Sequence, residues 1–322
     1  MYISPFNVRV RRKHAEARDI CSLELVSEGG EELPAFSAGS HIDVHLPGGS
    51  VRQYSLCNDP SEVHRYLIAV LRDPGSRGGS VAIHETVREG DSLTISVPKN
   101  HFGLVREAKK SLLLAGGIGV TPILSMAEQL AVTGADFQMH YATRSFECAA
   151  FIDRIEQSRF ADRVRLHFDS GDRAQRLELD AVLAAAEPDT HLYVCGPKGF
   201  MDAVLGTARA HGWAESNLHW EFFAGENVVP RNGDEGFDVQ LVSSGRVITV
   251  APNKTVTQAL SDAGVEVMVS CEQGVCGTCV TRVIEGIPDH RDCYLTPRER
   301  ATNDQFTPCC SRSKSARLVL DL

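Results

Sequence analysis

The sequence lacks the features that would place it in a membrane, outside the cell or on nucleic acid. Its longest uncharged run, Ser111–Ala127, contains three glycines and Pro122 and is shorter than the roughly 20 residues of a membrane-spanning helix. Residues 1–20 carry charge and have no apolar core of the kind a secretory signal needs. Basic residues are not in excess, since 42 acidic and 33 basic side chains give a net charge of −9. We therefore expect a cytoplasmic protein with no nucleic-acid or membrane partner.

The length and the changing pattern along the chain predict three domains. Residues 1–105 contain short β-rich segments separated by Gly, Pro and Asp turns, which is typical of an antiparallel β-barrel. Residues 106–228 alternate apolar strands with helical segments, which predicts an α/β domain with a parallel sheet. A polar, turn-rich linker at 229–236 precedes residues 237–322, which predict an α+β domain of the β-grasp type. The predicted fold class is thus a multidomain chain with an antiparallel β-barrel, an α/β parallel-sheet domain and an α+β β-grasp domain.

Cysteines crowd into the last sixth of a chain without export signals, and this distribution favours a metal centre over disulfides. The segment CEQGVCGTC places Cys271, Cys276 and Cys279 with four and two intervening residues. This is the spacing of plant-type [2Fe–2S] ligands. Gly274 and Gly277 allow the backbone to wrap closely around a cluster and to point N–H groups at its sulfurs.

The fourth ligand of a four-cysteine cluster has to come from a separate segment. Cys309 stands just before the last predicted strand, with 29 residues between it and Cys279, so a compact fold could return it to the loop. A zinc site is one alternative, but zinc sites usually pair two short Cys-x₂₋₄-Cys segments, and here the second half offers only adjacent cysteines. Buried structural thiols are the other, and we assign no role to the isolated Cys21, Cys57, Cys148 and Cys293.

Two turns at strand ends predict a nucleotide site in the middle domain. In LLLAGGIGVTP an apolar strand leads through Gly117 and Gly119 into a helix, an arrangement on which a pyrophosphate can rest. Pro122 stands where the dinucleotide fingerprint has its third glycine, so a plain tight turn is the alternative. A second strand ends in YVCGP, where ligands bind open α/β sheets. This turn comprises Cys195, Gly196 and Pro197.

The first domain offers residue types that suit a flavin. In RQYSLCND, Arg52 supplies a cation for a phosphate, Tyr54 an aromatic face for the isoalloxazine ring and Ser55 a hydroxyl for flavin N5. Alternation puts Arg52 and Tyr54 on one face of the strand and Ser55 on the other, unless the strand bends. The loop DPGSRGGSV can cradle a phosphate, and an ordinary strand and turn are the alternatives. Its residues for this role are Arg77, Gly78, Gly79 and Ser80.

Taken in order, the motifs of the chain resemble phthalate dioxygenase reductase and the vanillate demethylase reductases, the reductase components of Rieske non-haem iron oxygenases. The resemblance covers the chain from about residue 50 to its end. It rests on RQYSLCND, RGGS, AGGIGVTP, YVCGP, HWEFF, CEQGVCGTC, DHRD and CCSRSKSARLVLDL. In that family an FMN barrel, an NADH domain and a plant-type ferredoxin domain follow one another, so the resemblance implies FMN, NADH and a [2Fe–2S] cluster.

The resemblance also implies roles for individual residues. Ser55 and Cys195 would lie at the reacting flavin and nicotinamide rings, and Phe223, with Phe222 as the alternative, would cover the flavin. The family ending Cys-x-Ser-Arg, laid on CCSR, makes Cys309 the fourth ligand. The implied FMN residues are Arg52, Tyr54, Ser55, Gly78, Gly79 and Ser80, and the implied NADH residues are Gly117, Gly119, Thr121, Cys195, Gly196 and Pro197.

Selectivity for NADH over NADPH is predicted from the segment HFDSGD. Asp169 and Asp172 follow a predicted strand, where a carboxylate accepts from a ribose 2′-hydroxyl and repels a 2′-phosphate. Arg144 would instead favour NADPH. For each of these three charged residues, the alternative is an ordinary solvent-exposed loop position with no role in binding.

The resulting functional prediction is an NADH-dependent flavin and iron–sulfur oxidoreductase that passes single electrons to a Rieske oxygenase or demethylase in a transient complex. We expect a monomer. A reductase for a cytochrome P450 or a diiron hydroxylase is the alternative among enzymes, because a terminal acceptor leaves little trace in the sequence of its donor. A redox sensor that binds flavin and cluster is the alternative outside enzymes.

Overall fold

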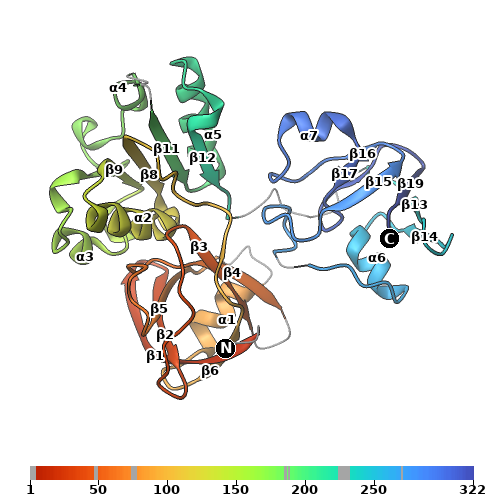
Figure 1. Ribbon diagram of the computed structural model, residues 1–322, viewed down its shortest axis with the longest axis horizontal. Helices are drawn as coiled ribbons and strands as arrows, with labels where there is room; N and C mark the ends of the chain where they lie inside the picture. The colour runs from red at the N-terminus through yellow and green to blue at the C-terminus, as the bar shows by residue number, and fades with distance from the viewer. Residues whose placement is uncertain are drawn as a thin grey trace. The chain divides into compact units, whose positions relative to one another are not determined.

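The structure of the protein, a computed structural model, describes residues 5–46, 50–73, 78–184, 187, 189–223, 233–269 and 271–322 (Figure 1). The chain forms two compact units, Met1–Glu221 and Phe222–Leu322. The first unit contains an antiparallel barrel followed by a parallel sheet, and the second contains a small mixed sheet with the cysteine loop. Within the described ranges, no helix is long and apolar enough to cross a membrane.

The barrel closes because the two end strands of its sheet meet. Antiparallel strands follow the order β4-β3-β6-β1-β2-β5, and a bridge between Leu56 and Ile68 joins the chain just after β4 to β5. Alternate apolar residues such as Val8, Val10 and Leu23 fill the interior. The elements are β1 (Phe6–Ala17), β2 (Ile20–Ser27), β3 (Ser40–His45), β4 (Val51–Ser55), β5 (Tyr66–Leu71), α1 (Gly79–Thr86), β6 (Ser92–Ile95) and β7 (Lys99–Asn100), which pairs with β3.

The parallel sheet has the strand order β10-β9-β8-β11-β12. Its first strand in the chain, β8, lies in the middle, so the order reverses between β8 and β11. Helix α2 packs on β8, β9 and β11 with the face that contains Val120, Ile123 and Leu124. The elements are β8 (Lys110–Gly116), α2 (Val120–Thr133), β9 (Asp136–Thr143), α3 (Ile152–Glu156), β10 (Val164–Phe168), α4 (Leu179–Leu183), β11 (Thr190–Cys195), α5 (Lys198–Ala210) and β12 (Leu218–Glu221).

Single turns of 3₁₀ helix connect these elements. They are η1 (Gly117–Gly119), η2 (Phe146–Cys148), η3 (Ala161–Arg163), η4 (Arg173–Gln175) and η5 (Glu215–Asn217). Helix α2 ends at Gly134, whose φ of +70° lets its N–H bond back to the carbonyls of Leu130 and Ala131.

The second unit has a five-stranded sheet in the order β14-β13-β19-β15-β17, with β13 and β19 parallel and the other pairs antiparallel. Helix α6 buries Val256 and Leu260 in the core of this unit and begins with a capping box between Thr255 and Gln258. The elements are β13 (Phe237–Leu241), β14 (Val247–Val250), α6 (Val256–Asp262), β15 (Thr281–Glu285), β16 (Pro288–Asp289), α7 (Pro297–Thr302), β17 (Gln305–Phe306), β18 (Arg312–Ser313) and β19 (Arg317–Leu320).

Part of the segment that the sequence assigns to the linker is held by the second unit. Asp234 forms a bidentate ion pair with Arg291 at 2.6 and 2.9 Å, and its carboxylate lies 3.7 Å from Arg312. The guanidinium of Arg312 also donates to the carbonyl of Glu235. The described barrel strands end at Asn100 and the parallel sheet runs from Lys110 to Glu221, while the predicted domain bounds themselves stay predictions.

Candidate functional site

All five strands of the parallel sheet end at one edge, and the predicted nucleotide turns lie there. Because the strands are parallel, Gly116, Thr143, Phe168, Cys195 and Glu221 are the last residues of their strands at this edge. The two turns follow β8 and β11, which flank the point where the strand order reverses. Open α/β sheets bind ligands in the crevice at this point.

The two turns touch each other through their backbones. A Cβ on Gly119 would lie 2.2 Å from the carbonyl oxygen of Cys195, and one on Gly196 would lie 2.9 Å from the α-carbon of Gly116. The ring of Phe200 covers both Gly116 and Gly196 at distances that leave no room for a side chain. Three of these glycines are therefore required by close approach, and Phe200 is a packing residue that the motif alone does not reveal.

The predicted nucleotide residues differ in what they offer a ligand. Gly117 has a φ of +53° and open space where a side chain would stand. Thr121 is buried, and its hydroxyl donates to the carbonyl of Ile118 at 3.1 Å, so it shapes the turn. Pro197 is exposed and immediately precedes α5. Gly196 is closed in by Phe200, as described above.

The charges predicted to select the nucleotide lie next to each other at the same sheet edge. Asp169 directly follows β10 and its N–H donates to Thr143, while the N–H of Ser170 donates to the carbonyl of Arg144. Asp169 and Arg144 are both exposed. The structure thus brings the carboxylate and the opposing cation to one place, and the choice between NADH and NADPH stays a prediction.

The predicted phosphate residues of the flavin site meet at the first turn of α1. The Arg52 side chain lies so close to Gly79 that a Cβ there would be 2.9 Å from its Cγ and Nε. Gly78 has a φ of +85° and precedes the helix, whose N-terminus attracts anions. Ser80 engages the backbone of Asp73, with its Oγ 3.1 Å from the nitrogen. Arg77, predicted to belong to this cradle, lies outside the described residues.

Tyr54 and Ser55 have different surroundings, as strand alternation predicts. Tyr54 packs against the barrel core, and burial raises the pKa of its hydroxyl. Ser55, the last residue of β4, donates a hydrogen bond of 3.3 Å to the carboxyl group of Glu221. The barrel and the edge of the parallel sheet are thus joined through Ser55.

Glu221 is a site residue that the sequence reasoning missed, although it lies in the quoted motif HWEFF. It pairs with Cys195 across β11 and β12, and Cys195 is fully buried. Part of the Glu221 residue is exposed, but protein surrounds its carboxyl group, and this desolvation raises the pKa to about 8 despite the Ser55 hydrogen bond. Burial and the charge of Glu221 raise the pKa of Cys195, so this cysteine stays a thiol. A carboxyl at a strand end, two residues before the predicted Phe223, was the available signal.

Phe223 stands two residues after Glu221, at the start of the second compact unit. Phe222 and Phe223 are each half-buried. The role of Phe223 at the flavin stays a prediction.

The four predicted cluster ligands are buried, with Cys271 in contact with Cys276 and Cys309 in contact with both Cys279 and Cys310. The thiol of Cys271 hydrogen-bonds that of Cys276 and lowers its pKa to about 5, which favours the thiolate that binds iron. The thiol of Cys309 is in hydrogen-bonding contact with that of Cys279, so the return of Cys309 to the loop is observed. Among the described residues, no three His, Cys, Asp or Glu side chains are placed to hold one metal ion. In a four-cysteine [2Fe–2S] cluster each iron takes two thiolates.

The loop that carries three of these cysteines has the backbone that a cluster needs. Gly274 and Gly277 have φ values of +72° and +73°, which L side chains rarely adopt. The N–H of Gln273 points at the sulfur of Cys271 at 3.3 Å. A Cβ on Gly277 would also lie 2.2 Å from the ring of Tyr294, so this exposed side chain would have to move. Donor chemistry, burial and backbone all fit a [2Fe–2S] cluster.

Cys310 is buried beside the ligands, and its surroundings differ from those expected for an extended segment. Residues 308–310 form a turn, in which the N–H of Cys310 donates to Thr307. Its sulfur lies 3.1 Å from the hydroxyl of Thr307 and packs with Cys279 and Cys309. An extended segment would point Cys309 and Cys310 to opposite faces, whereas this turn leaves both sulfurs beside Cys279. All ten cysteines, which lie within the described ranges, are free thiols.

These features define a class of enzyme. A barrel whose Arg52 lies at the first turn of α1, a parallel sheet with two glycine turns at its switch point, and a three-cysteine loop joined by Cys309 are the parts of an electron-transfer oxidoreductase that serves an iron–sulfur centre.

The comparisons with known proteins agree with this class. The 2Fe-2S iron-sulfur cluster binding domain family matches residues 239–314, and the N-terminal domain of the dimethylamine monooxygenase subunit DmmA-like family matches residues 97–218. A vanillate O-demethylase oxidoreductase of Pseudomonas sp. (strain HR199 / DSM 7063) is 55% identical over 306 residues, which is 95% of this chain and 96% of that relative.

Two solved structures are also similar. Phthalate dioxygenase reductase, described as a modular structure for electron transfer from pyridine nucleotides to [2Fe–2S], matches with a TM-score of 0.80 and 40% identity over 99% of this chain and 98% of that one. An intact type IV self-sufficient cytochrome P450 monooxygenase matches with a TM-score of 0.82 and 40% identity over 99% of this chain but 41% of that one.

The chain belongs to the family of vanillate O-demethylase oxidoreductases and phthalate dioxygenase reductases. The family resemblance, the three-part fold class and the oxidoreductase function predicted from the sequence are confirmed. The C-terminal [2Fe–2S] domain is confirmed as well. Relatives of this kind are reductase components of oxygenase systems, which implies an oxygenase as the partner.

The raised pKa of Glu221 predicts a pH-dependent stability. Between the ordinary Glu value of 4.5 and about 8, the unfolded chain has released this proton and the folded chain keeps it. The free energy of unfolding should therefore fall as pH rises through this window, by at most about 1.4 kcal/mol per pH unit. Urea unfolding should show Glu221→Gln gaining stability relative to wild type from pH 5 to pH 9. The exposed Glu107→Gln is the control, and an equal gain there would contradict the assignment.

The two adjacent cysteines give a second prediction. Cys309→Ser should lose or strongly destabilise the visible [2Fe–2S] absorption and stop one-electron transfer, because Cys279 then has no partner thiolate. Cys310→Ser should keep both. Iron content and the visible spectrum of the purified variants measure this. A cluster lost from Cys310→Ser and kept in Cys309→Ser would reverse the roles.

Proposed function

We propose that the protein takes hydride from NADH onto FMN and passes single electrons through a [2Fe–2S] cluster to a Rieske-type oxygenase or demethylase. The observation that carries the proposal is the convergence of Ser55 from the barrel and Cys195 from the parallel sheet on Glu221. These are the residues predicted at the flavin and nicotinamide rings. Their meeting point in the first unit is where the two rings would have to stack for hydride transfer.

FMN is the flavin that the phosphate cradle supports. Arg52 lies against Gly79 at the start of α1, and together with the N–H groups of that turn it would hold the phosphate. Tyr54 would pack on the ring, with Gly78, Ser80 and Arg77 completing the phosphate loop. When bound, the flavin supplies the conversion of a two-electron hydride into single electrons.

Ser55 and Glu221 hold a proton at the point where hydride would arrive. At neutral pH the Glu221 carboxyl is mostly protonated, because its pKa is about 8, and Ser55 Oγ is 3.3 Å from its Oε2. The pair can therefore share and move a proton without an ionised group in the crevice. Cys195, a fully buried neutral thiol, would place no charge beside the nicotinamide.

The nucleotide would lie across the two glycine turns. Gly117 offers open backbone for the pyrophosphate, and Gly119, Thr121, Gly196 and Pro197 fix the shape of the turns. Asp169 would accept from the ribose hydroxyl and favour NADH, with Phe223 covering the flavin until the nicotinamide enters. The cluster would be held by Cys271, Cys276, Cys279 and Cys309.

The partner would be a Rieske oxygenase component that binds transiently to a monomeric reductase. The 40% identity to part of a self-sufficient P450 favours a P450 as the second candidate acceptor. Reduction assays with purified Rieske and P450 acceptors separate the two. A cytoplasmic location stays a prediction.

Removal of the Arg52 guanidinium should weaken FMN retention. Arg52→Ala loses a charge-assisted phosphate contact, which costs roughly 1.5–3 kcal/mol, or about one to two decades in affinity. Flavin titration of the apoprotein measures the change. Arg72→Ala, which breaks only the exposed ion pair with Glu85, is the matched control and should bind FMN as wild type does. Unchanged FMN affinity in Arg52→Ala would exclude this residue from the phosphate site.

Because the chain forms two compact units, we predict that hydride transfer and one-electron transfer can be separated. A chain that ends at about residue 230 keeps the whole first unit and should retain NADH-dependent reduction of ferricyanide. It should no longer reduce cytochrome c or the oxygenase, because the cluster is gone. Loss of hydride transfer in a folded, FMN-loaded truncation would contradict the proposed order of electron flow.

A further inference from the structure

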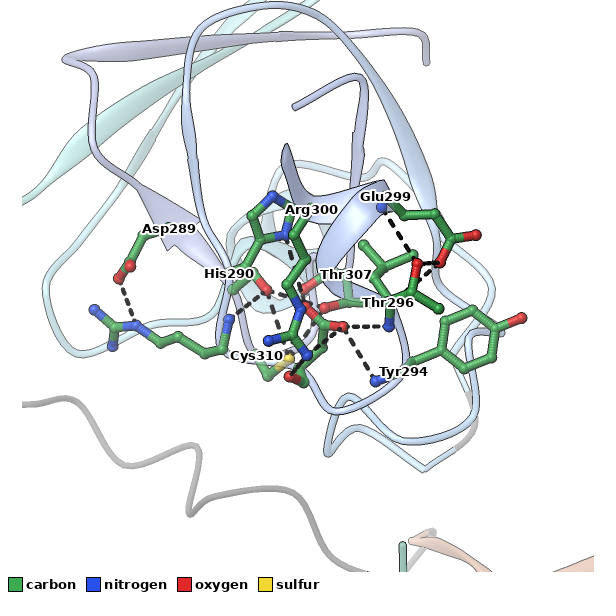
Figure 2. A network of polar contacts seen from close by, with 12 residues as sticks. Asp289, His290, Tyr294, Thr296, Glu299, Arg300, Thr307 and Cys310 are labelled. Carbon is green, nitrogen blue, oxygen red and sulfur yellow. Dashed lines mark hydrogen bonds and ion pairs between the residues drawn. The ribbon is translucent and has the colours of Figure 1, made fainter. Parts of the chain in front are cut away.

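The motif DHRD, residues 289–292, has no role in the function described so far. Asp289 ends β16, and the rest of the motif leads to α7. Figure 2 shows His290, Arg300, Tyr294 and Cys310 around one network of polar contacts in this region. The last residue of the motif, Asp292, has a side chain with no exposed surface.

The Asp292 carboxylate accepts backbone hydrogen bonds and lies beside a cation. Its Oδ2 accepts the N–H groups of Tyr294 at 3.1 Å and Leu295 at 2.7 Å, and the guanidinium of Arg300 lies 3.6 Å away. Backbone donors and a cation together offset the cost of burying a charge. Oδ1 accepts no hydrogen bond from the described residues, and its neighbour at 3.7 Å is a ring nitrogen of His290.

The positive charge around this carboxylate does not fully neutralise its negative charge. Burial lowers the pKa of His290, so the imidazole is neutral at neutral pH. Arg300 is the cation in contact, and about a third of its side chain is exposed to solvent. A partly solvated cation is screened by water more strongly than a carboxylate with no exposed surface. The electric field of the buried negative charge therefore reaches into the surrounding protein.

Asp292 lies directly against the loop that carries the cluster ligands. A Cβ on Gly274, between Cys271 and Cys276, would lie 2.9 Å from the α-carbon of Asp292 and 3.0 Å from its Cβ. The N–H of Cys293 donates to the carbonyl of Gly274 at 2.9 Å, so the two segments are fixed to each other. The same point on Gly274 is 2.4 Å from the sulfur of Cys310, the neighbour of the predicted ligand Cys309.

We propose that Asp292 is a positioning residue that sets the reduction potential of the [2Fe–2S] cluster by holding a negative charge against the ligand loop. This inference rests on the proposed placement of the cluster at Cys271, Cys276, Cys279 and Cys309. Reduction adds one electron to the cluster, and a fixed negative charge in a protein interior opposes it. Asp292 thus lowers the potential and makes the reduced cluster a stronger donor to the partner.

The test is a redox titration of the full-length protein with FMN and cluster bound, followed by the electron paramagnetic resonance signal of the reduced cluster. Asp292→Asn keeps an oxygen acceptor for the Tyr294 and Leu295 N–H groups and removes the charge. The midpoint potential should rise, so that the reduced-to-oxidised ratio at a fixed ambient potential increases roughly tenfold, which corresponds to 59 mV for one electron. Asp304→Asn removes a charge from an exposed position of the same unit and should leave the potential unchanged.

A fully loaded Asp292→Asn with an unchanged or lower potential would overturn the proposal, and so would an equal shift in Asp304→Asn. If Asp292→Asn does not assemble the cluster, the same redox titration of Arg300→Gln tests the proposal. Removal of the partly exposed cation should lower the potential, and an unchanged or higher value would overturn the proposal. Failure of the proposed function is distinguishable, because wild-type protein would then lack the [2Fe–2S] signal or keep it in Cys309→Ser.

Discussion

The contact between the two glycine turns is the constraint on which the first unit depends. Gly119 approaches the Cys195–Gly196 peptide so closely that any side chain would displace the end of β8 from the end of β11. Strand β12 pairs with β11 so that Glu221 lies beside Cys195, and Glu221 in turn accepts from Ser55 of the barrel. One backbone contact thus fixes the edge at which the predicted nicotinamide and flavin residues meet.

Close contacts of glycines also shape the cysteine loop of the second unit. Gly274 is pressed against Asp292 and Cys310, and Gly277 against the ring of Tyr294. Both glycines have positive φ values, so the loop needs them for its conformation as well as for space. The segment from Asp292 to Tyr294, which binds no iron in the proposed site, is therefore part of what shapes the cluster loop.

The fold and the cluster were predictable because their signals are local. Strand alternation, glycine turns and cysteine spacing depend on neighbours in the sequence, and they indicated the three-part fold class and the three cysteines of the loop. The choice of Cys309 rested on the family resemblance. Glu221 and Asp292 were not predicted as site residues, although both lie in quoted motifs. Their importance comes from tertiary contacts: Ser55 is 166 positions away from Glu221, and Gly274 touches Asp292 only after folding. The turn at 308–310 brings the sulfur of Cys310 beside Cys279 and Cys309, a contact that the order of residues does not reveal.

The two buried carboxyl groups, Glu221 and Asp292, have different partners in the two units. Glu221 accepts from a serine hydroxyl and has no ion pair with a cation of the described residues, and its raised pKa keeps a proton on it near neutral pH. Asp292 has two backbone N–H groups and the guanidinium of Arg300 as its partners. A neutral carboxyl at the first site would place no negative charge where a hydride arrives at the proposed flavin. Transfer through an iron–sulfur cluster moves an electron alone, so a fixed charge, which changes the energy of the electron without exchanging a proton, suits the second.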